Sequence, residues 1–186
     1  MTPDGALVPT THGPIEGFVD DGVYTFLGVP YAAPPVGDLR FRAPQDPACW
    51  DAPRDASALG PRCVQLDGDQ AGPNGDVIGD EDCLHLNVWT PETGPEDQVT
   101  KRPVMVFIHG GGNAVGSAVD PLYDGAALAR DHDVVVVTLN YRLAALGFLT
   151  HPALAGESAE GVSGNYATLD QLKALEWVQD NIAVFG

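Results

Sequence analysis

Basic residues are scarce in this chain. Lys and Arg together number 9 against 26 Asp and Glu, which gives a formal net charge of −17. A surface of that sign repels the phosphate backbone of nucleic acids, so the charge balance excludes DNA and RNA as expected partners. We interpret the acidity as a contribution to solubility.

Long hydrophobic runs are also missing. The longest, residues 134–139, is interrupted by Thr138 and is far too short to cross a bilayer. The first ten residues, MTPDGALVPT, contain no basic region followed by an apolar stretch, so we expect no signal peptide. The sequence therefore predicts no membrane span, and the lack of a leader favours the cytoplasm while leaving secretion open.

Cysteine is rare, with Cys49, Cys63 and Cys83 as the three in the chain. An odd number cannot form a closed disulfide framework, and the spacing fits no zinc site. We therefore expect no bound metal, and nothing in the sequence points to a cofactor.

Length and apolar content predict one folded domain. The 186 residues suffice for a single core, and 44% of them are hydrophobic, as is ordinary for a globular protein. Short alternating pieces in residues 5–31, separated by turn pairs such as Asp21-Gly22, predict a small antiparallel meander. Residues 30–75 are rich in proline and glycine and are expected to form an ordered loop.

The second half of the chain predicts a parallel sheet. Residues 84–90 alternate in a strand pattern, and residues 103–109 and 134–141 are apolar runs typical of strands buried on both faces. A short helical stretch at residues 124–132 lies between these two runs. A strand, a helix and a second strand in this order indicate a parallel pair with a crossover connection.

A final helix carries an apolar stripe. Its members recur at helical spacing, and we expect them to form the packing face of the helix. Thr168 and Gln171 predict a capping box at its start. The stripe consists of Leu169, Leu172, Leu175, Val178 and Ile182.

Three consecutive glycines follow the strand predicted at residues 103–109. They come directly after His109 in the segment VFIHGGGNAVGSA. A flexible turn is one interpretation, but the carboxyl end of a strand is where open α/β sheets place ligand sites, and successive unshielded N–H groups bind anions. The segment lacks the Lys-Ser/Thr pair of a P-loop and the spaced glycines of a dinucleotide site. An oxyanion hole remains, as in the HGGG loops of lipases and esterases.

Five stretches resemble the type-B carboxylesterase family, a carboxylesterase/lipase group with an α/β-hydrolase fold. Together they span nearly the whole chain, and their order and spacing also agree with the family. The resemblance implies a single, C-terminally incomplete α/β-hydrolase domain over residues 1–186, with a small antiparallel meander and then a mostly parallel sheet with crossover helices. The stretches are YTFLGVPYAAPPVGDLRF (24–41), EDCLHLNVWTP (81–91), PVMVFIHGGG (103–112), VVVTLNYRLAALGFL (135–149) and GNYATLDQLKALEWVQDNIAVFG (164–186).

The resemblance also implies catalytic roles for the glycines. Gly111 and Gly112 would supply two of the oxyanion-hole N–H groups, and Gly110 would shape the turn. Asn113 stands where a bulkier residue is frequent in the family, and residues 64–82 contain no tryptophan. The change at Asn113 alters the wall of the expected pocket, and the missing tryptophan argues against a site for a cationic choline group.

Four charged residues and two cysteines have structural roles by the same resemblance. Arg40 with Glu81, and Arg142 with Asp170, resemble ion pairs of the family. Cys63 and Cys83 resemble its first disulfide, which would close a loop of 20 residues and stabilise the fold by about 3 kcal/mol if oxidised. Such a bond would favour an oxidising compartment. Cys49 has no partner in the family and is expected to be a free, partly buried thiol.

The segment GESAEG, residues 156–161, imitates a nucleophile elbow. The motif G-x-S-x-G needs a glycine where Glu160 stands, and it must join a buried strand to a helix. We therefore do not expect Ser158 to be catalytic. No histidine takes the place of a catalytic base, and His109 resembles a loop scaffold. The chain is thus interpreted as an N-terminal fragment without nucleophile, acid or base, and we predict that it is inactive alone.

Two function classes stay open from the sequence. The first is a serine esterase that hydrolyses small carboxylic esters through an acyl-serine intermediate. The alternative is a non-catalytic, cholinesterase-like relative that serves binding or adhesion. The glycine run favours the enzyme, because a binding module has no need of bare N–H groups at that place.

Overall fold

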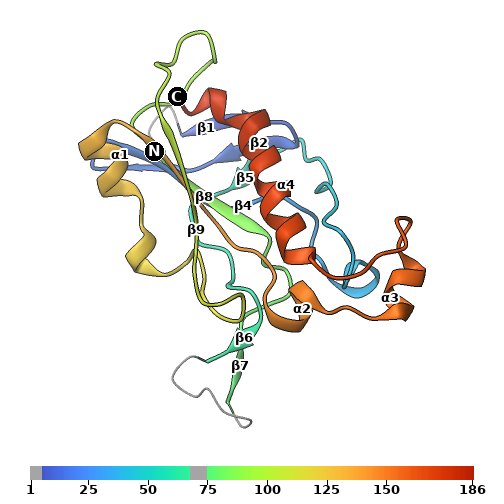
Figure 1. Cartoon of the computed structure of the whole chain (residues 1–186). Helices are drawn as coiled ribbons and strands as arrows, with labels where there is room; N and C mark the ends of the chain where they lie inside the picture. The colour runs from blue at the N-terminus through green and yellow to red at the C-terminus, as the bar shows by residue number, and fades with distance from the viewer. Residues whose placement is uncertain (1–5, 68–74) are drawn as a thin grey trace.

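A five-stranded sheet forms the centre of the molecule (Figure 1). The computed structural model describes residues 6–67 and 75–186. The central sheet has the strand order β3-β4-β8-β10-β9, a second sheet has the order β1-β2-β5, and β6 pairs with β7. The strands are β1 (Leu7–Thr10), β2 (Gly13–Glu16), β3 (Phe18–Asp20), β4 (Val23–Pro30), β5 (Arg54–Asp55), β6 (Gln65–Leu66), β7 (Val77–Ile78), β8 (His85–Thr90), β9 (Val104–Ile108) and β10 (Val135–Leu139).

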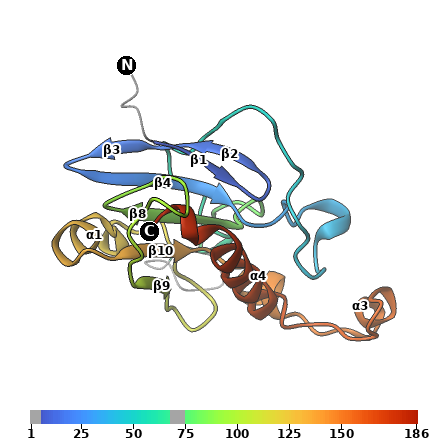
Figure 2. The ribbon, with the colours of Figure 1, turned by 90° about the horizontal axis from the view of Figure 1, so that it is seen from above.

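Four α-helices accompany the sheets in the described part of the chain. They are α1 (Ala126–His132), α2 (Ala144–Phe148), α3 (Pro152–Glu157) and α4 (Tyr166–Asn181). The views in Figures 1 and 2 both place α3 away from the sheets, beyond the start of α4. The sequence predicted α1 and α4, but it gave no sign of the two short helices between them. No helix within the described ranges has the length and apolar character that a membrane span requires.

As predicted, the strand pairing changes from antiparallel hairpins near the N-terminus to a parallel pair further along the chain. The N-terminal strands form the antiparallel hairpins β1–β2 and β3–β4, as the meander predicted. Strand β8 pairs antiparallel with both β4 and β10, whereas β9 and β10 run parallel with α1 in their connection. The strand, helix and strand prediction is therefore confirmed, and the parallel part of the central sheet consists of this pair in the described residues.

The side chains of β10 alternate between two layers of the core. Val135 and Val137 belong to a large apolar cluster that includes Trp177 of α4. Val136 instead joins a smaller cluster with Ala129 of α1. Because successive residues of a strand point to opposite faces, α4 and α1 cover opposite faces of the central sheet.

Strand β9 is less buried than predicted. The apolar run at residues 103–109 predicted a strand buried on both faces, but in the described residues β9 lies at the edge of the sheet and pairs with β10 alone. Met105 is 46% exposed and Phe107 is 37% exposed. The prediction of burial is therefore wrong for β9. It holds for β10, which lies between β8 and β9 and is buried at every residue.

The start and the packing face of α4 also differ from the prediction. The helix begins at Tyr166, after Asn165 in the left-handed backbone conformation (φ 57°), and no side chain caps it. Thr168 therefore lies inside the helix, and the predicted capping box with Gln171 is wrong.

The leucines of the predicted stripe lie on the outer side of α4. Leu172 is 51% exposed and Leu175 is 41% exposed. Val178 and Ile182, at the end of the predicted stripe, do pack on the large apolar cluster, so the prediction is wrong for the leucines alone. The buried residues of α4 are Tyr166, Ala167, Asp170, Ala174, Trp177, Val178 and Asn181.

Candidate functional site

The glycine loop, residues 110–116, begins directly after β9 and His109. The N–H groups of Gly111 and Gly112 donate a hydrogen bond to no acceptor in the described residues. Both residues are exposed, and a Cβ on Gly112 would meet no atom within 4 Å. The loop therefore offers two adjacent backbone donors to the space beside it.

The path of the backbone explains why glycine is needed at Gly111. Its φ is +117°, and an added Cβ would lie 1.9 Å from the carbonyl oxygen of Val115. The turn is closed by the N–H groups of Ala114 and Val115, which donate to the Gly111 carbonyl at 3.1 and 3.2 Å. A side chain at Gly111 would thus force this turn open.

The imidazole of His109 supports the first residues of the loop. Its ring stacks on Tyr141, with centroids 4.5 Å apart and planes at 15°. The Tyr141 hydroxyl donates to the His109 carbonyl at 2.8 Å. Burial lowers the pKa of His109 and so favours the neutral form of the ring. Its Nδ1 lies 2.9 Å from the carbonyl oxygen of Gly110, within the loop itself.

The far end of the loop is held by two amide side chains. Gln65 of β6 forms hydrogen bonds with both the N–H and the C=O of Gly116. Asn140, directly after β10, accepts from the Ser117 hydroxyl at 3.1 Å and from the Ala118 N–H at 2.8 Å. Sequence reasoning missed both residues. Asn140 is a polar residue near the end of the strand predicted at residues 134–141, which was the one signal available, and Gln65 carried none.

An apolar hollow borders the loop. It has a volume of ≈ 390 Å³ and is lined by Ala114 and Val115 of the loop, by α2 and by the β6–β7 pair. The Ala144 N–H of α2 donates to the carbonyl of Asn113 at 2.7 Å, which fixes that wall of the hollow. Residues 68–74, part of the segment 64–82 considered above, lie outside the described residues.

The two predicted pairs of charged residues lie in contact, in different surroundings. Arg40 donates to Glu81 through Nε (2.6 Å) and Nη2 (2.8 Å) at a partly exposed position. Arg142 donates to Asp170 through Nη2 (2.6 Å), Nε (2.8 Å) and its backbone N–H (3.1 Å), and both side chains are buried. Burial raises the pKa of Asp170, while the Arg142 guanidinium opposes that rise.

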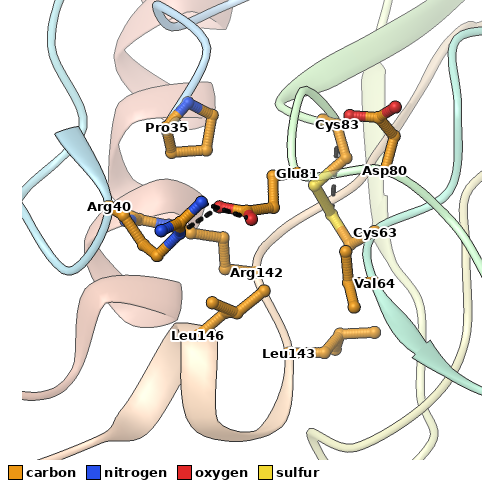
Figure 3. A pocket seen from close by; sticks show the side chains of 10 residues that line it. All are labelled: Pro35, Arg40, Cys63, Val64, Asp80, Glu81, Cys83, Arg142, Leu143 and Leu146. Carbon is orange, nitrogen blue, oxygen red and sulfur yellow. Dashed lines mark hydrogen bonds and ion pairs between the residues drawn. A yellow bond between two sulfur atoms is a disulfide. The ribbon is translucent and has the colours of Figure 1, made fainter. Parts of the chain in front are cut away.

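A disulfide joins Cys63 and Cys83 beside these pairs (Figure 3). Glu81 points toward Arg40 in this view, and Arg142 lies between that pair and Leu143. A small hollow of ≈ 10 Å³ lies among them. The disulfide, the Arg40–Glu81 pair and Arg142 thus line one region of the fold. Cys49 is a free thiol as expected, but it is exposed, so the prediction of partial burial is wrong.

Ser158 contacts no catalytic partner in the described residues. It follows the last residue of α3, and its hydroxyl donates to a Glu160 carboxylate oxygen at 2.8 Å. No serine hydroxyl in the described ranges forms a hydrogen bond with an imidazole nitrogen. Residues 6–67 and 75–186 also contain no cluster of three His, Cys, Asp or Glu side chains that could hold a metal ion.

Comparisons with known proteins agree on one family. The model of the carboxylesterase family matches residues 4–186. The fumonisin B1 esterase of Sphingopyxis macrogoltabida is 50% identical over 189 residues, covering 100% of this chain and 34% of that enzyme. The phenmedipham hydrolase of Pseudarthrobacter oxydans is 48% identical, over 97% of this chain and 35% of its own length.

The solved structures give the same result for the fold. A carboxylesterase of Geobacillus stearothermophilus matches with a TM-score of 0.83 and 42% identity, over 97% of this chain and 36% of that one. The α/β-hydrolase fold is therefore shared along the whole match. The chain spans about a third of the length of the relatives it matches.

Proposed function

We propose that this chain, which belongs to the carboxylesterase family, forms the N-terminal portion of a serine hydrolase of small carboxylic esters. The longer polypeptide that this proposal implies is called the whole enzyme below. In it, the N–H groups of Gly111 and Gly112 are two donors of the oxyanion hole. The observation that carries the proposal is that these two adjacent residues are exposed and that their N–H groups donate to no acceptor in the described residues.

The proposed chemistry at the glycine loop is stabilisation of negative charge. When a serine hydroxyl attacks the ester carbonyl, the carbonyl oxygen becomes an oxyanion in the tetrahedral intermediate. Two fixed N–H groups aimed at that oxygen lower its energy without any reorganisation, and each contributes about 3 kcal/mol to the barrier reduction. The turn closed on the Gly111 carbonyl and the stacked His109 ring support a fixed loop of this kind.

No serine in the described ranges is hydrogen-bonded to an imidazole, so we assign the donors to this chain and the nucleophile, the acid and the base to the rest of the whole enzyme. We therefore expect the polypeptide of residues 1–186 to be inactive, and we expect the apolar hollow beside Ala114 and Val115 to receive an apolar part of the ester in the whole enzyme. The unpaired amides favour this function over a non-catalytic binding relative, for which exposed donors have no use.

The test compares two polypeptides on a short-chain aryl ester. The whole enzyme should hydrolyse it, and residues 1–186 alone should not. Ser158→Ala should leave the turnover of the whole enzyme unchanged, because that hydroxyl is engaged with Glu160 on the surface. Turnover by residues 1–186 that disappears with Ser158→Ala would refute the assignment, as would a whole enzyme without activity on any ester.

A further inference from the structure

We infer that Gln65 is a positioning residue for the oxyanion donors, an inference that rests on the function proposed above. Its Nε2 donates to the Gly116 carbonyl at 2.8 Å, and its Oε1 accepts from the Gly116 N–H at 2.9 Å. A primary amide that bonds both backbone groups of one residue fixes its position and also its orientation. The Gln65 side chain is itself buried, which limits the competition of water for these bonds.

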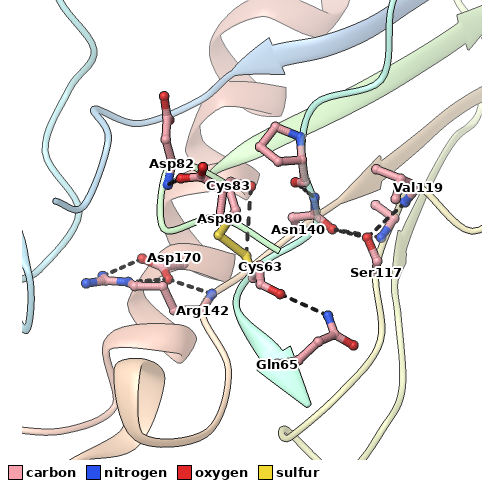
Figure 4. Close-up of a disulfide and its surroundings, with 12 residues drawn as sticks. Cys63, Gln65, Asp80, Asp82, Cys83, Ser117, Val119, Asn140, Arg142 and Asp170 are labelled. Atoms are coloured by element: carbon pink, nitrogen blue, oxygen red, sulfur yellow. Dashed lines mark hydrogen bonds and ion pairs between the residues drawn. A yellow bond between two sulfur atoms is a disulfide. The ribbon is translucent and has the colours of Figure 1, made fainter. Parts of the chain in front are cut away.

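Gln65 is anchored on the other side to the disulfide. Its Nε2 also donates to the Cys63 carbonyl at 3.0 Å, and Cys63 is bonded to Cys83 (Figure 4). Cys63 further forms an isolated parallel bridge with Asp80. The amide therefore connects the glycine loop to a segment held by a covalent bond.

Gly116 lies in direct contact with the start of the loop. A Cβ on Gly116 would fall 2.3 Å from the Gly110 carbonyl oxygen and 2.5 Å from His109 Nδ1. Its neighbour Val115 donates to the Gly111 carbonyl at 3.2 Å. A shift of Gly116 therefore moves the peptide units that carry the two proposed donors.

This arrangement predicts an effect on the transition state rather than on substrate binding. The oxyanion forms only as the ester reacts, so displaced donors lower kcat and leave KM nearly unchanged. Removal of one oxyanion donor lowers kcat by about 10²- to 10³-fold. A displaced donor retains part of its interaction, and we expect a loss of about tenfold or more.

The first experiment compares Gln65→Met with Gln45→Met in the whole enzyme. Methionine matches the length of glutamine without its hydrogen bonds. Gln45 is a suitable control, because it is exposed and its Nε2 donates only within its own loop, to the carbonyls of Ala43 and Pro44. The readouts are kcat per titrated active site, KM for a short-chain aryl ester, and affinity for an aryl trifluoromethyl ketone, which mimics the tetrahedral intermediate.

We expect Gln65→Met to lower kcat about tenfold or more, beyond any change in KM caused by its place in the lining of the apolar hollow, and to weaken binding of the ketone by the same factor as kcat/KM. Gln45→Met should match the wild type. Counting active sites separates this result from a loss of folded enzyme. A kcat for Gln65→Met within twofold of the wild type would overturn the inference while the proposed function stands. An inactive wild-type enzyme would overturn both.

A second variant covers the case in which Gln65→Met does not fold. In Gln65→Glu, the carboxylate faces the carbonyl oxygens of Gly116 and Cys63, and its protonated form can again donate to one of them. The kcat of Gln65→Glu relative to wild type at the same pH should therefore rise as the pH falls. A ratio near one at every pH would overturn the inference.

Discussion

Substitution of Gly111 by alanine gives the sharpest test of the glycine loop. An added Cβ would lie 1.9 Å from the Val115 carbonyl oxygen, whereas ordinary contact begins near 3.4 Å. The difference, 3.4 minus 1.9, requires the loop to shift by about 1.5 Å. The backbone must also keep a φ of +117° or abandon it, and a non-glycine residue held in such a conformation costs about 1–3 kcal/mol.

The expected consequence is loss of turnover. A displacement of that size takes the Gly111 N–H out of hydrogen-bonding range of the oxyanion, so kcat should fall by about 10²- to 10³-fold, with KM little changed. Gly112→Ala should have a smaller effect. Its Cβ meets no atom within 4 Å, and the cost is confined to a φ of +61°.

The assay is steady-state hydrolysis of a short-chain aryl ester by the whole enzyme, with active sites counted by titration. Gly156→Ala serves as the control, because Gly156 lies in α3 and its added Cβ would also meet nothing within 4 Å. A kcat for Gly111→Ala within tenfold of the wild type would refute the assigned role. So would an equal loss with Gly156→Ala.

Three further predictions concern stability, measured by chemical denaturation of the whole enzyme. Asp170→Asn leaves the buried Arg142 guanidinium without its counter-charge and should lower the free energy of unfolding by about 3–5 kcal/mol, whereas Arg40→Gln, at a partly exposed pair, should have a much smaller effect. Replacement of Cys63 and Cys83 by serine should lower it by about 3 kcal/mol, and an unchanged value would show that the bond is absent. Burial lowers the pKa of His85 from 6.5, so the unfolded chain binds a proton at this residue more readily than the folded chain does. Stability should therefore fall as the pH drops below about 6.5, and His85→Phe should flatten this slope.

The sequence predicted the elements whose signals are local. Apolar runs marked β9 and β10, and helical spacing marked α4, because these patterns depend on neighbouring residues alone. Burial depends on where an element lies in the sheet. The same kind of apolar run is therefore buried in β10 and half-exposed in β9. For α4, the exposed Leu172 shows that the stripe with the largest side chains need not be the face that packs.

For the candidate site, the sequence indicated the donors but not the residues that hold them. The glycine run is a local signal, because consecutive glycines in the sequence directly indicate a backbone without side chains. The link between Gln65 and Gly116 joins residues 51 positions apart. No spacing rule connects such residues, so the support of the loop became visible only with the fold. The pairing of Arg142 with Asp170 was reached through the family resemblance for the same reason.

The open side of β9 has a consequence for handling the isolated polypeptide. One side of its backbone ladder is unpaired in the described residues, and such an edge is a template on which separate molecules join their sheets. The net charge of −17 opposes this joining, because like-charged copies repel each other across roughly one Debye length. That length shrinks from about 30 Å at 0.01 M salt to about 3 Å at 1 M. The isolated polypeptide should therefore remain soluble at low salt concentration and aggregate at high salt concentration.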